Sequence, residues 1–185
     1  LAAFSSNSPY AQVGAERELL LMMAYEPMVL LTAIGFYVQL GSFRVDDIYA
    51  TESMPLLPLI GIFAGYVYIL TIKFRKSPFD LSTSHHGHQE LVKGLTTEFS
   101  GKTLAIMEVA HWYENVFLLG IVFLFFMNGT ALMVIVGLII CAVTYFFEVF
   151  IDNTFARVKW QLALNYAWAV AFVLGGINLF ILILG

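Results

Sequence analysis

Charged residues are scarce in this sequence. They make up 12% of its 185 residues, against about 25% in an ordinary soluble domain. Hydrophobic residues make up 60% of the chain. A soluble domain of this size cannot bury so much apolar surface, because much of its surface must stay in contact with water. The shortage of charge therefore excludes an ordinary soluble protein and indicates a membrane protein.

Cysteine is nearly absent as well. The single cysteine, Cys141, lies in an apolar stretch, so it supports neither a disulfide framework nor a cysteine-ligated metal or cluster site. His85, His86 and His88 stand close together, but a histidine site without nearby cysteines would need further ligands. We expect no metal site and no catalytic metal centre in this chain. A signal peptide is also missing, because the first sixteen residues contain no apolar core.

Long apolar runs, in contrast, are abundant. A membrane-spanning helix needs about 20 largely apolar residues. No charged residue occurs between Glu114 and Glu148, and such a run, about 50 Å long as a helix, is too long for one crossing. The turn dipeptide Asn128-Gly129 divides it, and the helix before this break must extend upstream through Glu114 to reach spanning length. The pattern predicts an all-α polytopic transmembrane helix bundle, one domain over residues 1–185, with five helices at about 18–40, 54–74, 102–127, 130–151 and 161–184.

The basic residues indicate the orientation of these helices. Eight of the nine fall on one side of the alternating loops, and Arg44 falls on the other. The eight are Arg17, Lys73, Arg75, Lys76, Lys93, Lys102, Arg157 and Lys159. Positive charge gathers on the cytoplasmic side of membrane proteins. We therefore expect a multi-pass protein of the cell inner (plasma) membrane, with loop 75–101 in the cytoplasm and the C-terminus outside.

Several ionisable residues lie within the predicted spans. Each costs about 2.5–3.5 kcal/mol to insert, so such residues tend to face partners or water and to be functional. Glu26 precedes the helix-kinking Pro27, whereas Glu108, His111 and Glu114 recur along one side of their helix. We predict a proton path through Glu26, Glu108, His111, Glu114, Glu148 and Asp152, with Glu26 and the Glu108–Glu114 side chains lining a common interior surface.

Plainer interpretations of these acids remain open. Glu26 can reach the lipid headgroups from a helix end, and His111 can form a static contact with a neighbouring glutamate. Glu148 and Asp152, one turn apart on one helix face, can belong to a solvated helix end.

The loop between the second and third predicted helices carries three motifs in order. They read Pro78-Phe79-Asp80-Leu81, then Glu90-Leu91-Val92 with Gly94, then Thr97-Glu98 with Ser100-Gly101. Together with the N-terminal stretch they resemble the NADH dehydrogenase subunit 1 family of respiratory complex I over nearly the whole chain. Members of that family have about three more helices, some of them N-terminal, so we expect the first helices of the family to be missing from a chain that starts at Leu1.

Two departures refine this resemblance. Complex I members usually carry an acidic-Thr-Asn-Arg stretch before the first motif, where this chain has Lys73-Phe74-Arg75-Lys76. A histidine-rich stretch, residues 82–89, replaces an acidic one. The basic version resembles the membrane subunit of energy-converting [NiFe] hydrogenases of the Ech or membrane-bound type, and of their sulfane reductase relatives.

That resemblance implies a function and partners. The chain would be the membrane-anchor and proton-path subunit of a ferredoxin-dependent oxidoreductase, holding no cofactor itself. Hydrogenase large and small subunits and iron–sulfur proteins would carry [4Fe-4S] clusters and a NiFe centre, and antiporter-like membrane subunits and lipid would surround it; no nucleic acid is expected. The arm-contact and coupling residues would be Arg75, Pro78, Phe79, Asp80, Glu90 and Glu98.

Two other functions remain open. The first is the quinone-site membrane subunit of complex I itself, against which the missing acidic-Thr-Asn-Arg stretch argues. The second is a free-standing secondary transporter, since broken helices such as that expected at Glu26-Pro27 also occur in transporters. Neither the transported ion, proton or sodium, nor the terminal electron acceptor is specified by these residues.

Overall fold

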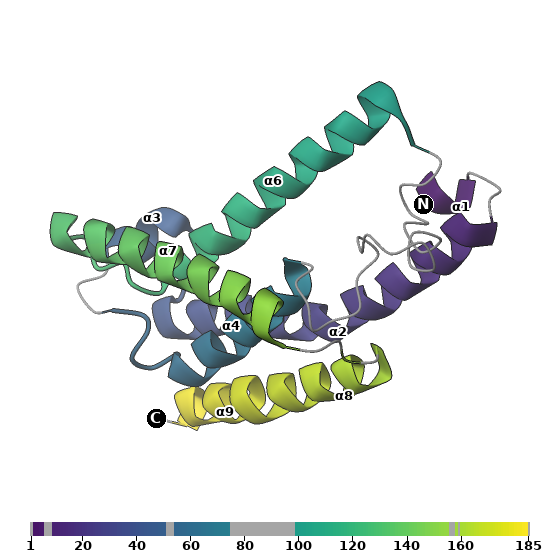
Figure 1. The fold of residues 1–185 in the computed structure, drawn as a ribbon. Coiled ribbons are helices and arrows are strands. Elements are labelled where there is room, and N and C mark those ends of the chain that lie inside the picture. Colours follow the sequence, from purple (N-terminus) through teal and green to yellow (C-terminus); the bar gives the residue numbers. More distant parts are fainter. Residues whose placement is uncertain are drawn as a thin grey trace.

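The computed structural model describes residues 2–5, 9–50, 54–74, 99–155, 158 and 160–184. The elements in these ranges are helices (Figure 1), and the predicted all-α membrane class is confirmed. They are α1 (Ala2–Ser5), α2 (Pro9–Leu40), α3 (Val45–Ala50), α4 (Ile60–Lys73), α6 (Gly101–Leu124), α7 (Ala131–Thr154), α8 (Trp160–Val170), the π-helix η2 (Ala171–Gly176) and α9 (Ile177–Leu184).

Four helices are long and apolar enough to cross a membrane, namely Ala11–Leu40, Gly101–Leu124, Ala131–Thr154 and Gln161–Leu184. The remaining predicted span, α4, has only 14 residues, about 21 Å of helix against a hydrocarbon core of about 30 Å. Residues 54–59 were expected to be helical but form turns. Pro55 and Pro58 explain this, because proline lacks a backbone N–H and disfavours helix at the residue before it.

Other helix boundaries also differ from the expected ones. Helix α2 begins at Pro9 rather than near residue 18, and proline is favoured at the first helical position. Helix α3 was not expected, and its first turn carries Asp46 and Asp47, which suit the positive end of the helix dipole. The predicted break at Asn128-Gly129 is confirmed, since Gly129 has a φ of 75° and α7 begins at Ala131.

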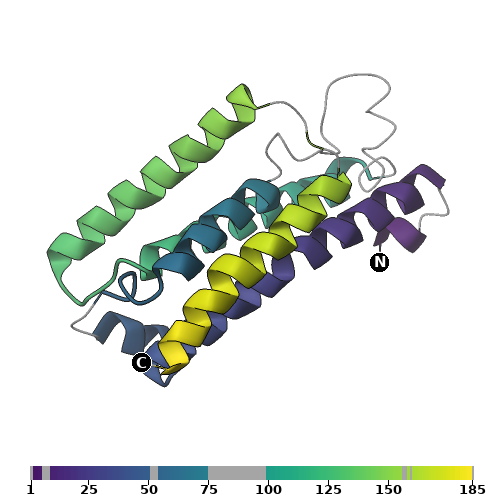
Figure 2. The ribbon, with the colours of Figure 1, turned by 90° about the horizontal axis from the view of Figure 1, so that it is seen from below.

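Helices α2, α4 and the continuous α8–η2–α9 rod pack side by side and form most of the core (Figures 1 and 2). The rod presents a small buried residue at every fourth position, namely Ala163, Ala167, Ala171 and Gly175. Small residues let helix backbones approach closely within a membrane, where lipid supplies no hydrophobic driving force between helices. This close packing fixes α4 between α2 and the rod.

Helices α6 and α7 form a second pair beside this core. The C-terminal half of α6 packs on α7, where the Cys141 thiol donates a hydrogen bond to the Leu119 carbonyl oxygen at 3.3 Å. The N-terminal half of α6 diverges from the neighbouring helices (Figure 1), and the buried residues of this helix are Leu118 and Val122. The divergent half carries Glu108, His111 and Glu114.

Candidate functional site

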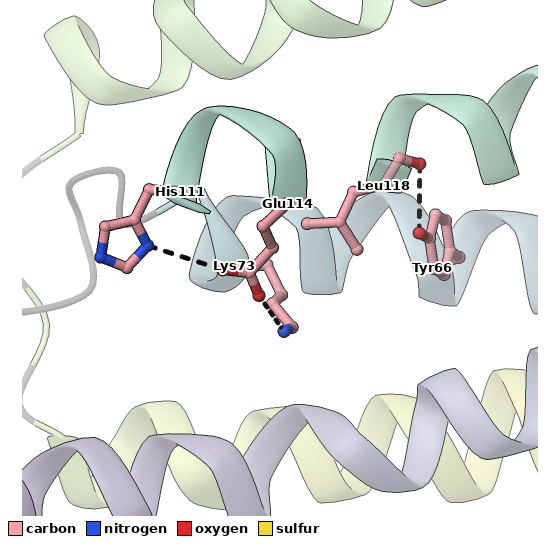
Figure 3. A network of polar contacts seen from close by, with 5 residues as sticks. All are labelled: Tyr66, Lys73, His111, Glu114 and Leu118. Carbon is pink, nitrogen blue, oxygen red and sulfur yellow. Dashed lines mark hydrogen bonds and ion pairs between the residues drawn. The ribbon is translucent and has the colours of Figure 1, made fainter. Parts of the chain in front are cut away.

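Three helices bring four polar or aromatic residues into one line, which we call the polar row: Tyr25 of α2, Lys73 of α4, and Glu114 and His111 of α6. Lys73 Nζ donates a hydrogen bond to Glu114 Oε1 at 2.5 Å, and His111 Nδ1 lies 3.6 Å from Glu114 Oε2. Figure 3 shows these three side chains pointing toward one another. Lys73 Nζ also lies 4.4 Å from the centroid of the Tyr25 ring, within the range of a cation–π interaction.

Burial along the polar row decreases from α2 toward α6. Tyr25 is 8% exposed, and the side chains of Lys73 and Glu114 are 17% and 39% exposed. The closed end therefore lies between α2 and α4, and the open end lies on α6, where the His111 side chain is 30% exposed. Charges in such a partly dry setting interact more strongly than at a fully wet surface. The row can thus hold an ionised carboxylate at a place where a group outside this chain can still reach it.

A second interhelical contact fixes the alignment of α4 and α6. The Tyr66 hydroxyl donates a hydrogen bond to the Leu118 carbonyl oxygen at 3.2 Å, and Tyr66 is fully buried. Tyr66 precedes Lys73 by two helical turns and Leu118 follows Glu114 by about one, so each pair lies on one helix face. Figure 3 shows the two contacts side by side. The Tyr66–Leu118 contact therefore sets the register that brings Lys73 to Glu114.

Two of the predicted proton-path residues, His111 and Glu114, belong to the polar row. Glu26 and Glu108 are exposed, so neither lines an interior surface formed by this chain, which differs from the expectation. The reason for Glu26 is helical geometry. Its neighbour Tyr25 faces Lys73, and successive residues on a helix point about 100° apart. The place of Glu26 and Glu108 on a proton path stays a prediction.

The predicted pair on α7 is placed differently from a solvated helix end. Glu148 is fully buried and shares its inward stripe with Gly137 and Thr144. Asp152, one turn further on, is half-buried. The solvated interpretation is therefore wrong for Glu148, whereas its role in proton transfer stays a prediction.

The predicted coupling residues of the loop lie outside the described residues, as do the three clustered histidines. These are Arg75, Pro78, Phe79, Asp80, Glu90 and Glu98, with His85, His86 and His88. Within the described ranges, no three His, Cys, Asp or Glu side chains gather closely enough to hold a metal ion.

Sequence reasoning missed two members of the polar row. It used Lys73 only as a count toward the orientation of the spans. One signal was available, because Lys73 ends an apolar helix at the position where the resembling family carries an acid. Tyr25 offered no comparable signal, since an aromatic residue on an apolar helix is common.

The polar row has a definite chemical capacity. A carboxylate between an ammonium and an imidazole can accept a proton from the imidazole and return it, while the ammonium stabilises the ionised state. None of these groups exchanges electrons. The arrangement therefore suits the movement of charge or protons within the membrane region rather than redox chemistry.

Known proteins resemble this chain along nearly its whole length. A family model described as NADH dehydrogenase matches residues 1–183. An NADH-quinone oxidoreductase membrane subunit of Carboxydothermus hydrogenoformans is 26% identical over 196 residues, covering 98% of this chain and 54% of the relative. The corresponding NADH-quinone oxidoreductase protein of Cereibacter sphaeroides is 29% identical over 190 residues, covering 98% and 58%. The chain thus spans little more than half the length of these relatives.

A solved structure shares the fold. A chain from the membrane-bound sulfane sulfur reductase, an archaeal respiratory membrane complex, is 26% identical with a TM-score of 0.75. The match covers 97% of this chain and 62% of the other.

Proposed function

The chain belongs to the NADH dehydrogenase family, and from this premise we propose that it is a membrane subunit of a complex I-like oxidoreductase. More specifically, it is the anchor and proton-path subunit of a ferredoxin-dependent energy-converting [NiFe] hydrogenase or of a sulfane reductase-type relative. Its task is to connect redox events in a cytoplasmic arm to ion movement through the membrane helices.

The polar row is the observation that carries this proposal. An ion pair between α4 and α6, extended by an imidazole, is costly within a membrane unless it serves the movement of charge. The link from His111 Nδ1 to Glu114 Oε2, at 3.6 Å, needs only a small rotation or one bridging water to pass a proton. The open end of the row lies on α6, where other subunits can reach it.

The hydrogenase or sulfane reductase assignment has separate support. The basic stretch Lys73-Phe74-Arg75-Lys76 stands where complex I members usually carry an acidic one, and the chain is similar to a membrane-bound sulfane sulfur reductase. In this assignment, partner subunits hold the [4Fe-4S] clusters and any NiFe centre, and antiporter-like subunits complete the ion path. Loop 75–101 contacts the cytoplasmic arm.

A second candidate function is the quinone-site membrane subunit of complex I. The names of the two relatives from Carboxydothermus and Cereibacter, both NADH-quinone oxidoreductase subunits, favour it. A free-standing transporter has no comparable support, because family membership points to a multi-subunit complex.

One purification separates these functions. A tag on this chain should isolate a complex from native membranes, and its metals and activities are then measured. Nickel together with iron, and hydrogen evolution from reduced ferredoxin, are expected for the hydrogenase type. Iron without nickel, with reduction of sulfane sulfur, indicates the relative. NADH-driven quinone reduction would replace our assignment by complex I, and a tagged chain that transports ions without iron–sulfur partners would overturn the subunit proposal altogether.

A further inference from the structure

We propose that Lys73 is a movable counter-charge with two seats, the Glu114 carboxylate and the face of the Tyr25 ring, and that protonation of Glu114 sends it from the first to the second. The biological role of this switch rests on the proposed function. The two seats themselves are a property of the polar row.

Both seats are already in contact with the ammonium group. Lys73 Nζ lies 2.5 Å from Glu114 Oε1 and 4.4 Å from the centroid of the Tyr25 ring. The lysine stands in the last turn of α4, and its flexible four-carbon stem lets the charged end turn without any movement of the helix. The move from one seat to the other is therefore a side-chain rotation.

The groups around the row make the two seats unequal in a useful way. The titratable groups that act most on Lys73 are Tyr25 of α2 and Glu114 of α6, and Glu18 of α2 adds negative charge on the Tyr25 side. Tyr25 is almost completely buried, so an ammonium on its face loses water but keeps the attraction of the ring. An ionised Glu114 is the stronger seat, and a neutral Glu114 is the weaker one.

The proton step balances in charge and in atoms. A protonated His111 gives its Nδ1 proton to Glu114 Oε2, so that one N–H bond breaks and one O–H bond forms. His111 and Glu114 become neutral, and Lys73 keeps its positive charge. The sum of charges on the three groups is the same before and after, but positive charge has moved from the α6 side of the row toward α2. Protonation on α6 is thereby felt at the α2–α4 contact.

The test uses the tagged, purified complex reconstituted into proteoliposomes, with ions moved per electron as the measurement. Tyr25→Leu removes the second seat, and Lys73→Gln removes the moving charge. Each should lower the ratio by about fivefold, the lower end of typical coupling between sites. Tyr25→Phe keeps the ring and should retain most of the ratio. Tyr113→Leu serves as the matched control, because Tyr113 lies on α6 away from the row with 74% of its surface exposed.

Two results would overturn the switch. One is an unchanged ratio in both Tyr25→Leu and Lys73→Gln, which would make the ion pair a static clamp. The other is equal loss in Tyr25→Phe and Tyr25→Leu, which would exclude the ring as a seat.

Should Tyr25→Leu fail to assemble, infrared difference spectra of Lys73→Gln decide the question. The carboxylic acid band of Glu114, assigned through Glu114→Gln, should then no longer respond to turnover as it does in the wild type, and an unaltered response would contradict the proposal. A wild-type complex that moves no ions at all would refute the proposed function instead.

Discussion

At the scale of single residues, Glu114 is held by basic groups on both of its oxygens, Lys73 at one and His111 at the other. We predict that Lys73 and Glu114 are energetically coupled. Lys73→Gln and Glu114→Gln should each destabilise the complex, and the double variant should lose less than the sum. The coupling should be about 1–2 kcal/mol, between the values of exposed and fully buried pairs. Thermal unfolding midpoints of the four purified proteins measure it, and strictly additive losses would show that the two residues do not interact.

The Tyr66 hydroxyl gives a second prediction at this scale. Tyr66→Phe keeps the buried ring but removes the hydrogen bond to the Leu118 carbonyl oxygen, so it should cost about 0.5–1.5 kcal/mol. It should also lower the ion-to-electron ratio, because the same contact sets the register of Lys73 against Glu114. Tyr113→Phe, on the exposed face of α6, is the control and should change neither. A normal ratio in Tyr66→Phe would show that Lys73 reaches Glu114 without this contact.

At the scale of helices, the closest approach to the rod is at Gly61 in α4. A Cβ added there would lie 2.9 Å from the Leu174 backbone oxygen and 2.8 Å from Asn178 Cβ. The Asn178 amide also donates to the Pro58 carbonyl oxygen at 3.2 Å, which holds the start of α4 against the rod. Gly61→Ala should therefore cost about 1–3 kcal/mol by forcing these backbones apart.

Gly120 is the matched control for this prediction. It is also a helical glycine, and a Cβ there meets no atom within 4 Å, so Gly120→Ala should be neutral or stabilising by up to about 1 kcal/mol. The yield and the thermal midpoint of the assembled complex compare the two variants. Equal behaviour would mean that α4 has room to shift away from the rod.

Helices were more predictable from this sequence than the contacts between them. The length of apolar runs fixes where spans lie, and Asn128-Gly129 marked the break between α6 and α7, because both signals are local. The late start of α4 depends on Pro55 and Pro58, a local signal that run length outweighed. The π-helix η2 and the meeting of Lys73 with Glu114 have no local signal, since both depend on how separate helices pack. Periodicity could place His111 and Glu114 on one face but could not say which helix lies opposite.

At the scale of the whole molecule, the two ends differ in charge. The end of α2, helix α3, the α6–α7 turn and the end of α9 lie at one end of the molecule (Figures 1 and 2), with Arg44 as the basic residue of that region. The start of α6 and the end of α4 lie toward the other end, where Lys73 and Lys102 stand. Because positive charge is retained in the cytoplasm, the Lys102 end should face the cytoplasm, which would place the polar row on the side where the redox arm docks.

Cysteine labelling in intact cells tests this orientation. The background variant is Cys141→Ala, which removes the single native thiol. Phe43→Cys and Thr130→Cys lie at exposed positions of one end, and Ser100→Cys at an exposed position of the other. A membrane-impermeant maleimide should label the first two about tenfold more strongly than Ser100→Cys, and inside-out vesicles should reverse the order, because basic loops stay in the cytoplasm. Labelling of Ser100→Cys from outside intact cells would invert the molecule, put the open end of the polar row outside the cell, and leave the cytoplasmic redox arm without access to Glu114.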